Sequence, residues 1–206
     1  MKYVLYLIVA FVFSSARADQ AVDYFRAVSV DDAGTVKALL ARGFDPNTVD
    51  PKGQTALHLA LRDDSPKVLA ALLAHAQIRI DATNASDETP VMMAALRGQL
   101  EWTQKLLDRG AAVNRPGWTP LHYAAIGPEP KVVALLLARG AQVEARSPNR
   151  TTPLMMAARY GPEDAVDLLL AKGASLQARN DPGLGAADFA KLGGREALAK
   201  RLEAAR

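Results

Sequence analysis

Histidines, methionine pairs and acidic pairs are the side chains in this 206-residue sequence whose types and spacing could do chemistry. The three histidines, His58, His75 and His122, lie far apart, and none follows a nucleophilic-triad order or a zinc-protease spacing. Cysteine is absent, which excludes disulfides, thiol catalysis, cysteine-ligated zinc and iron–sulfur clusters. The sequence therefore predicts no enzyme, no catalytic residue, no metal site and no cofactor.

The remaining candidates have simpler interpretations as well. Met92-Met93 and Met155-Met156 are interpreted as adaptable core fillers, and the alternative is thioethers that bind Cu(I) or absorb oxidant. Asp63-Asp64 and Asp87-Glu88 are interpreted as solvated turn residues or helix-start charges rather than catalytic acids.

Residues 1–18 have the pattern of a secretory signal peptide. Met1-Lys2 gives a positive start, an 11-residue apolar run follows over Tyr3–Phe13, and Ala16-Arg17-Ala18 offers a cleavage site. A bilayer-spanning helix needs about 20 residues, so an uncleaved anchor is the less favoured alternative. The prediction is cleavage after Ala18, a periplasmic mature chain, and no stable membrane insertion after cleavage.

The rest of the sequence repeats with a period near 33. Four similar hexapeptides begin 34, 30 and 33 residues apart, and each is followed 21 residues after its first position by a small residue that closes an apolar segment. Degenerate copies extend the series at both ends, which gives about six repeats. They begin near residues 22, 55, 89, 119, 152 and 185.

The repeat pattern predicts a pair of helices in each copy. Threonine can cap the first helix, proline suits its first position, and a glycine such as Gly140 suits a left-handed residue after the second helix. The second helices are apolar, and Trp102 is predicted to be core. The interval from Gly110 to Thr119 is 9 residues where others have 12 or 13, which predicts one shortened loop and a notch beside it.

The repeats resemble the ankyrin family. Thr119–Ala124 (TPLHYA) and the glycine-alanine-x-valine pattern at Gly140–Val143 carry the resemblance, which spans residues 19–206. It implies an all-α solenoid of helix–turn–helix units joined by short β-hairpin loops, with the first and last units as caps. In Arg195–Arg206, Leu198 and Leu202 are expected to face the stack. The resemblance also implies that His58 and His122 bond loop backbone between repeats.

The same resemblance implies a concave binding surface made of loop tips and the exposed ends of the first helices. Tryptophan, tyrosine and arginine are the types that dominate binding hot spots. The matching positions predict a protein-binding site composed of Arg62, Arg97, Trp118, Tyr123, Arg159 and Tyr160.

The predicted function is a monomeric, non-catalytic protein-binding module exported to the bacterial periplasm. Its net charge of +3 is too small and too scattered to indicate a nucleic-acid partner. The resemblance to exported bacterial ankyrin proteins slightly favours an accessory role in oxidative-stress resistance, with an immunity protein that blocks a periplasmic or cell-wall-targeting enzyme as the close alternative. A host-directed secreted binder and a cryptic enzyme are further alternatives.

Overall fold

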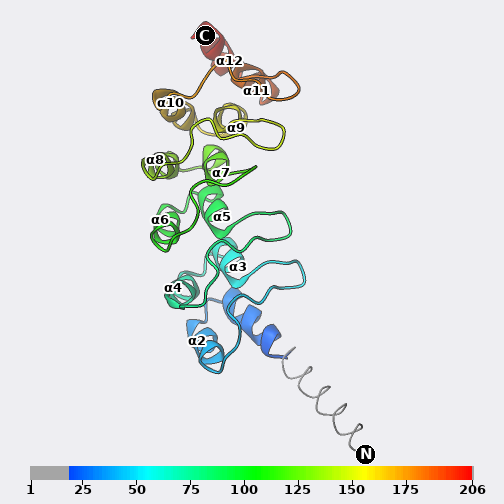
Figure 1. Cartoon of the computed structure of the whole chain (residues 1–206), viewed down its shortest axis with the longest axis vertical. Coiled ribbons are helices and arrows are strands. Elements are labelled where there is room, and N and C mark those ends of the chain that lie inside the picture. Colours follow the sequence, from blue (N-terminus) through cyan, green and yellow to red (C-terminus); the bar gives the residue numbers. More distant parts are fainter. Residues whose placement is uncertain (1–18, 206) are drawn as a thin grey trace, which may run out of the picture. The chain divides into compact units, whose positions relative to one another are not determined.

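The computed structural model describes residues 19–205 as helices and connecting loops (Figure 1). The contacts between residues gather into two compact bodies, an N-terminal body that ends at Pro90 and a C-terminal body that begins at Val91. The proposed signal peptide, residues 1–18, lies outside the described residues.

The N-terminal body holds four helical segments: residues 19–29, α2 (Ala33–Ala41), α3 (Ala56–Arg62) and α4 (Pro66–Ala74). Its core includes the fully buried Tyr24, whose hydroxyl donates to the Pro46 carbonyl at 3.2 Å. The Tyr24 ring packs against Phe44 with centroids 4.7 Å apart. Burial, and secondarily the charge of Asp45, raises the pKa of this phenol.

We call the loop before the first helix of each repeat its finger. In the finger before α3, the Asp50 carboxylate accepts from the backbone N–H of Lys52 and of Gln54, both at 2.8 Å. This is a tight turn closed by a left-handed residue, Gly53. Within residues 19–205, Val49–Thr55 is the single antiparallel bridge, so the predicted hairpin loops contain very little strand.

The C-terminal body consists of an inner and an outer row of helices (Figure 1). Contacts join α7 to α9, α9 to α11, and α8 to α10. The inner row comprises α5 (Pro90–Leu96), α7 (Pro120–Ile126), α9 (Pro153–Tyr160) and α11 (Ala186–Leu192). The outer row comprises α6 (Leu100–Asp108), α8 (Pro130–Ala138), α10 (Glu163–Ala171) and α12 (Glu196–Ala204).

The helices begin and end where the repeat pattern predicts. Thr119 and Thr152 are N-cap residues, and a proline follows each at the first helical position. Gly110, Gly140 and Gly173 follow outer helices with φ of 91°, 87° and 87°. The predicted all-helical repeat fold is therefore confirmed.

Neighbouring inner helices approach so closely that only glycine fits between them. A Cβ added at Gly127 would lie 2.6 Å from the carbonyl oxygen of Ala95. One added at Gly161 would lie even closer to the carbonyl oxygen of Ala125. These obstacles are backbone atoms, which cannot rotate away, so the inner row depends on these two glycines.

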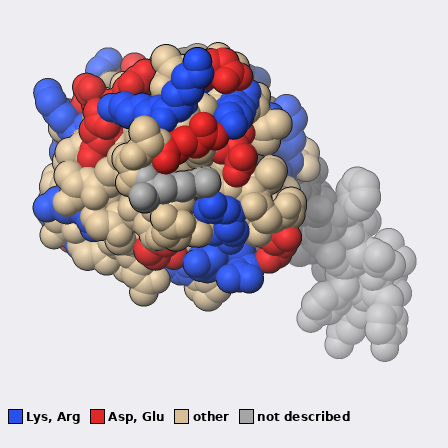
Figure 2. Space-filling view, turned by 90° about the horizontal axis from the view of Figure 1, so that it is seen from above, with Lys and Arg blue, Asp and Glu red and all other residues tan. Residues whose placement is uncertain are grey.

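The last repeat is attached by both of its helices, because α11 packs against α9 and the start of α12 bonds to the end of α9. Leu198 and Leu202 are buried, as their amphipathic spacing predicts. Arg195 donates from one guanidinium nitrogen to the carbonyl oxygens of Ala157, Ala158 and Gly161 at 2.7–3.1 Å. These bonds satisfy carbonyls at the end of α9. Seen from the C-terminal end, the surface carries basic and acidic side chains side by side (Figure 2).

The prediction that Trp102 is core was wrong. It stands on α6 at the position that holds Val132 on α8 and Ala165 on α10, both fully buried. An indole is much larger than either side chain, and Trp102 is only half-buried. The ammonium of Lys105 lies 4.4 Å from its ring centroid, so part of the ring forms a surface contact instead.

Candidate functional site

The inner row of the C-terminal body presents apolar side chains at equivalent helix positions. The fifth residue of the hexapeptide is Met93, Tyr123 or Met156, and each of these is half-buried. Three residues later on α5 and α7 stand Leu96 and Ile126, also half-buried. An i, i+3 spacing places both positions on one face of each helix. Neighbouring inner helices therefore share a partly apolar face.

Two large side chains on this row extend furthest into solvent. Tyr160, at the end of α9, is 56% exposed, and Leu192, at the end of α11, is 53% exposed. The sequence predicted Tyr123 and Tyr160 as site residues but missed Met93, Met156 and Leu192. The register of the repeat was the signal for all three, because each occupies a position equivalent to one already chosen.

Trp118 is the last residue of the shortened finger. The loop before α7 reaches less far than those before α9 and α11, which confirms the shortened loop (Figure 1). The Trp118 indole is half-buried and meets the His122 ring edge-on, with centroids 5.2 Å apart. Trp118 therefore combines an accessible face with a fixed position. The notch beside the finger stays a prediction.

His122 is a structural residue of this face. Its Nε2 donates to the carbonyl of Thr151 at 3.0 Å, so Nδ1 is the acceptor for the Thr119 hydroxyl at 2.9 Å. Burial lowers the pKa of His122 to about 4, which keeps the ring neutral. His58 repeats the arrangement in the N-terminal body, with Nε2 on the Glu88 carbonyl at 2.9 Å. The implied bonding of both histidines to loop backbone is confirmed.

The methionine pairs divide between core and surface. Met92 and Met155 are fully buried at the histidine position, which confirms core filling for that member of each pair. The Met155 sulfur accepts from the Thr152 N–H at 3.4 Å, where a histidine nitrogen stands in other repeats. The Met92 sulfur lies 4.0 Å from a guanidinium nitrogen of Arg115.

Arg159 and Tyr160 place a positive charge beside an exposed aromatic ring on this face. The guanidinium carbon of Arg159 lies 4.8 Å from the centroid of the Tyr160 ring, a cation–π contact. The Arg159 Nε is buried and has no hydrogen-bond acceptor among the described residues. A buried donor without an acceptor is unfavourable, so the hydrogen-bonding capacity of Arg159 is not satisfied within the chain. Arg97 is exposed just after α5.

Arg62 belongs to the N-terminal body and has its own partners. Its Nε and one terminal nitrogen donate to the two carboxylate oxygens of Asp63 at 2.7 and 2.9 Å. These bonds hold the pKa of Arg62 above its usual value. The structure therefore places five of the six predicted residues in the C-terminal body, with Arg62 in the N-terminal body.

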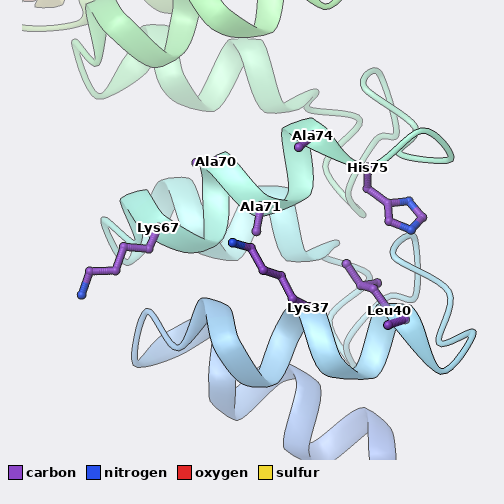
Figure 3. Close-up of a pocket in the computed structure, with 8 residues that line it drawn as sticks. Lys37, Leu40, Lys67, Ala70, Ala71, Ala74 and His75 are labelled. Atoms are coloured by element: carbon purple, nitrogen blue, oxygen red, sulfur yellow. The ribbon is translucent and has the colours of Figure 1, made fainter.

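Open grooves lie between outer helices. In the N-terminal body, a groove of about 430 Å³ runs between α2 and α4, where Ala70, Ala71 and Ala74 leave space beside Lys37 (Figure 3). In the C-terminal body, a second groove of about 560 Å³ runs between α8 and α10. Among residues 19–205, no group of three or more histidine or acidic side chains is placed to hold a metal ion. No helix in this range is long and apolar enough to cross a membrane.

Comparisons with known proteins find relatives that match over a small part of their own length and a solved structure that matches over almost all of its length. A family model of ankyrin repeats in three copies matches residues 25–116 and 112–180. The nuclear factor NF-kappa-B p105 subunit of Gallus gallus is 32% identical over 142 residues, which cover 66% of this chain and 14% of that protein. The B-cell lymphoma 3 protein homolog of Mus musculus is 33% identical over 133 residues, covering 61% and 30%. The chain thus spans less than a third of either relative.

A solved structure matches over almost its full length. It is a chain in the complex of the predatory endopeptidase Bd0816 from Bdellovibrio bacteriovorus with the immunity protein Bd3460. The TM-score is 0.76 at 26% identity, and the match covers 89% of the present chain and 98% of that one.

Proposed function

Because this chain belongs to the ankyrin-repeat family, we propose that it is a non-catalytic module that binds one protein partner through the C-terminal body. The proposed contact surface is the inner row with its fingers. Large aromatic and arginine side chains of the kind found in binding hot spots gather there. Exposed Tyr160 and Leu192, with half-buried Trp118, provide apolar area that the isolated chain leaves in water.

We further propose that the partner is an enzyme and that binding inhibits it, as an immunity protein does. The observation that carries this proposal is the full-length likeness to a chain of an endopeptidase–immunity protein complex. In the curated relatives only a fraction of a much larger protein matches. The accessory role in stress resistance has no comparable observation in its favour, so inhibition becomes the leading proposal.

Export remains part of the proposal. The support is the apolar run Tyr3–Phe13 followed by Ala16-Arg17-Ala18. Removal of residues 1–18 would leave every described helix intact. Mass spectrometry of periplasmic material should find Asp19 as the first residue. An intact N-terminus in the membrane fraction would contradict cleavage.

The test of the inhibitory function is a titration. The mature chain, residues 19–206, is added to each exported endopeptidase of its own organism and to Bd0816, and hydrolysis is measured. We expect stoichiometric inhibition of at least one of the organism's own enzymes, and loss of that inhibition in a Trp118→Ala, Arg159→Ala double variant. Arg62→Ala is the matched control and should inhibit normally. Full activity of every enzyme at excess inhibitor would overturn the proposal.

A further inference from the structure

The C-terminal body carries its excess positive charge on one side. We define its finger face as residues 91–97, 111–126, 141–160 and 174–192, which are the inner row and its fingers. The rest of this body up to residue 205, which is the outer row and its turns, balances eight basic residues against eight acidic ones. The finger face has seven basic and three acidic residues. The basic ones are Arg97, Arg115, Arg146, Arg150, Arg159, Arg179 and Lys191, and the acidic ones are Glu144, Asp181 and Asp188.

The three acidic side chains of the finger face already have bonds or ion pairs within the chain. Glu144 accepts from the backbone N–H of Ser175 at 2.8 Å, and Asp188 accepts from that of Gly185 at 2.8 Å. Asp181 lies 3.9 Å from the Nε of Arg150. Each of these carboxylates therefore has a partner within the chain. Arg150 and Lys191 are also paired, with Asp181 and Glu203, and the remaining basic side chains of the face are arginines in excess of its acidic groups.

Arg159 is the arginine with the clearest unmet requirement. Its buried Nε has no acceptor, and the guanidinium makes no ion pair with a described residue. The terminal nitrogens are not among the buried atoms, so they are the donors that a partner carboxylate can reach, beside Tyr160, which is 56% exposed. The corresponding arginine in the N-terminal body, Arg62, is followed by Asp63 and binds both of its carboxylate oxygens. A carboxylate matches the forked donors of a guanidinium. Arg159 has the fork but is followed by a tyrosine.

We propose that the finger face binds an acidic segment of a separate protein, with one carboxylate seated on Arg159 and an apolar side chain beside Tyr160. This inference rests on the proposed protein-binding function and specifies the chemistry of the partner. Complementary charge also accelerates association and excludes basic competitors. The partner surface is therefore rich in aspartate or glutamate around a hydrophobic residue.

A second copy of this chain is the competing occupant. The fingers and inner helix of the N-terminal body, residues 44–63 and 76–88, carry six acidic and three basic residues. Several of those carboxylates are bonded locally, because Asp63 pairs with Arg62, and Asp45 and Asp50 accept backbone N–H groups of their own turns. Acidic groups tied to their own fingers are poor ligands for Arg159, so a separate protein is favoured.

The test uses two labelled peptides and the mature chain. One peptide alternates aspartate with leucine, and the matched peptide alternates lysine with leucine. We expect measurable binding of the aspartate peptide alone. This binding should weaken as ionic strength rises from about 0.1 M to about 1 M, where the Debye length falls from about 10 Å to about 3 Å. Chemical-shift changes should map to the finger face.

Three variants locate the contact. Arg159→Gln should weaken binding of the aspartate peptide about fivefold or more, because a hydrogen-bonded charge pair is lost. Tyr160→Asp should weaken it more than Tyr160→Asn, since the new carboxylate occupies Arg159 as Asp63 occupies Arg62. Arg139→Gln, on the outer surface beside Asp108, removes the same charge and should change the affinity less than about twofold.

Other outcomes overturn the proposal. Equal binding of both peptides, or equal effects of Arg159→Gln and Arg139→Gln, would show that the face does not select carboxylates. Concentration-dependent dimerisation that the aspartate peptide disrupts would make a second copy the occupant. Peptide binding without inhibition of any endopeptidase would refute the inhibitory role alone, and inhibition unaffected by Arg159→Gln would refute this inference alone.

Discussion

Arg62 and Arg159 occupy the same repeat position in the two bodies, yet one is satisfied within the chain and the other is not. The residue after each arginine makes the difference. Asp63 binds both arms of Arg62, whereas Tyr160 offers Arg159 only the face of a ring and leaves its Nε without an acceptor. A surface that already holds its counter-charge has little to gain from a partner, and one that lacks it is available for binding.

The two bodies also differ in how neighbouring repeats contact each other. In the C-terminal body, Gly127 and Gly161 let inner helices touch backbone to backbone. In the N-terminal body, Asp64 takes the left-handed turn after α3, and Ser65 donates its hydroxyl to the Val28 carbonyl at 2.8 Å. Polar side chains join the repeats there. The C-terminal body thus relies on backbone contact at a repeat position where the N-terminal body uses a polar side chain.

The largest expected effect comes from removing the last repeat. A chain that ends at Asn180 loses α11, α12 and the Arg195 bonds to the end of α9. The newly exposed apolar surface should cause aggregation. Light scattering after size exclusion measures this, and a monomeric truncated chain at high concentration would show that the last repeat is dispensable.

The next effect tests the close approach of inner helices. Gly161→Ala should lower the free energy of unfolding by about 3 kcal/mol, because the methyl group meets backbone that cannot move aside. Gly34→Ala, on α2 of the N-terminal body, meets only the Asp32 side chain at 3.2 Å and should change stability by less than about 0.5 kcal/mol. Denaturant unfolding compares the two, and equal losses would refute the backbone explanation.

A pH dependence follows from His122. Its pKa is about 4 when folded and near 6.5 when unfolded, so below pH 6.5 the unfolded chain binds the extra proton. The stabilisation is complete above pH 6.5 and is lost as the pH falls toward 4. Between pH 7 and pH 5 the loss should be about 2 kcal/mol. His122→Met, which copies the repeat at Met155, should unfold with a shallower pH dependence; an unchanged slope would exclude His122 as its source.

The smallest effect concerns Trp102. Because its indole is half-buried, Trp102→Ala should cost about 1 kcal/mol, much of it from the contact with Lys105. Leu106→Ala on the same helix removes a fully buried side chain and should cost about 2–5 kcal/mol. Thermal melts of the two variants distinguish these values. A larger loss at Trp102 would mean that the ring is more deeply packed than its exposure indicates.

The sequence predicted the helix boundaries well because each depends on a local residue. Thr152 caps a helix, Pro153 begins it, and Gly173 ends the next one by chemistry that operates within a few positions. The shortened finger was predictable for the same reason, since a count between Gly110 and Thr119 is enough.

The features that the sequence did not predict depend on the space around a side chain. Trp102 lies in an apolar stripe, but the room available at its position follows from the neighbouring repeat. The contrast between Arg62 and Arg159 likewise follows from which acceptors lie within reach. A whole-chain charge of +3 concealed the separation of charge between finger surfaces, because opposite excesses cancel in the total.

The central claim is that the partner contacts the C-terminal body and not the equivalent positions of the N-terminal body. Isothermal calorimetry against the partner protein tests it with two matched double variants, both first shown to be folded. Trp118→Ala with Arg159→Ala should weaken binding by at least about 2 kcal/mol, the usual hot-spot threshold. Gln54→Ala with Arg62→Ala changes the same repeat positions in the N-terminal body and should change binding by less than about 0.5 kcal/mol. Normal binding by the first variant, with loss of binding by the second, would contradict the account.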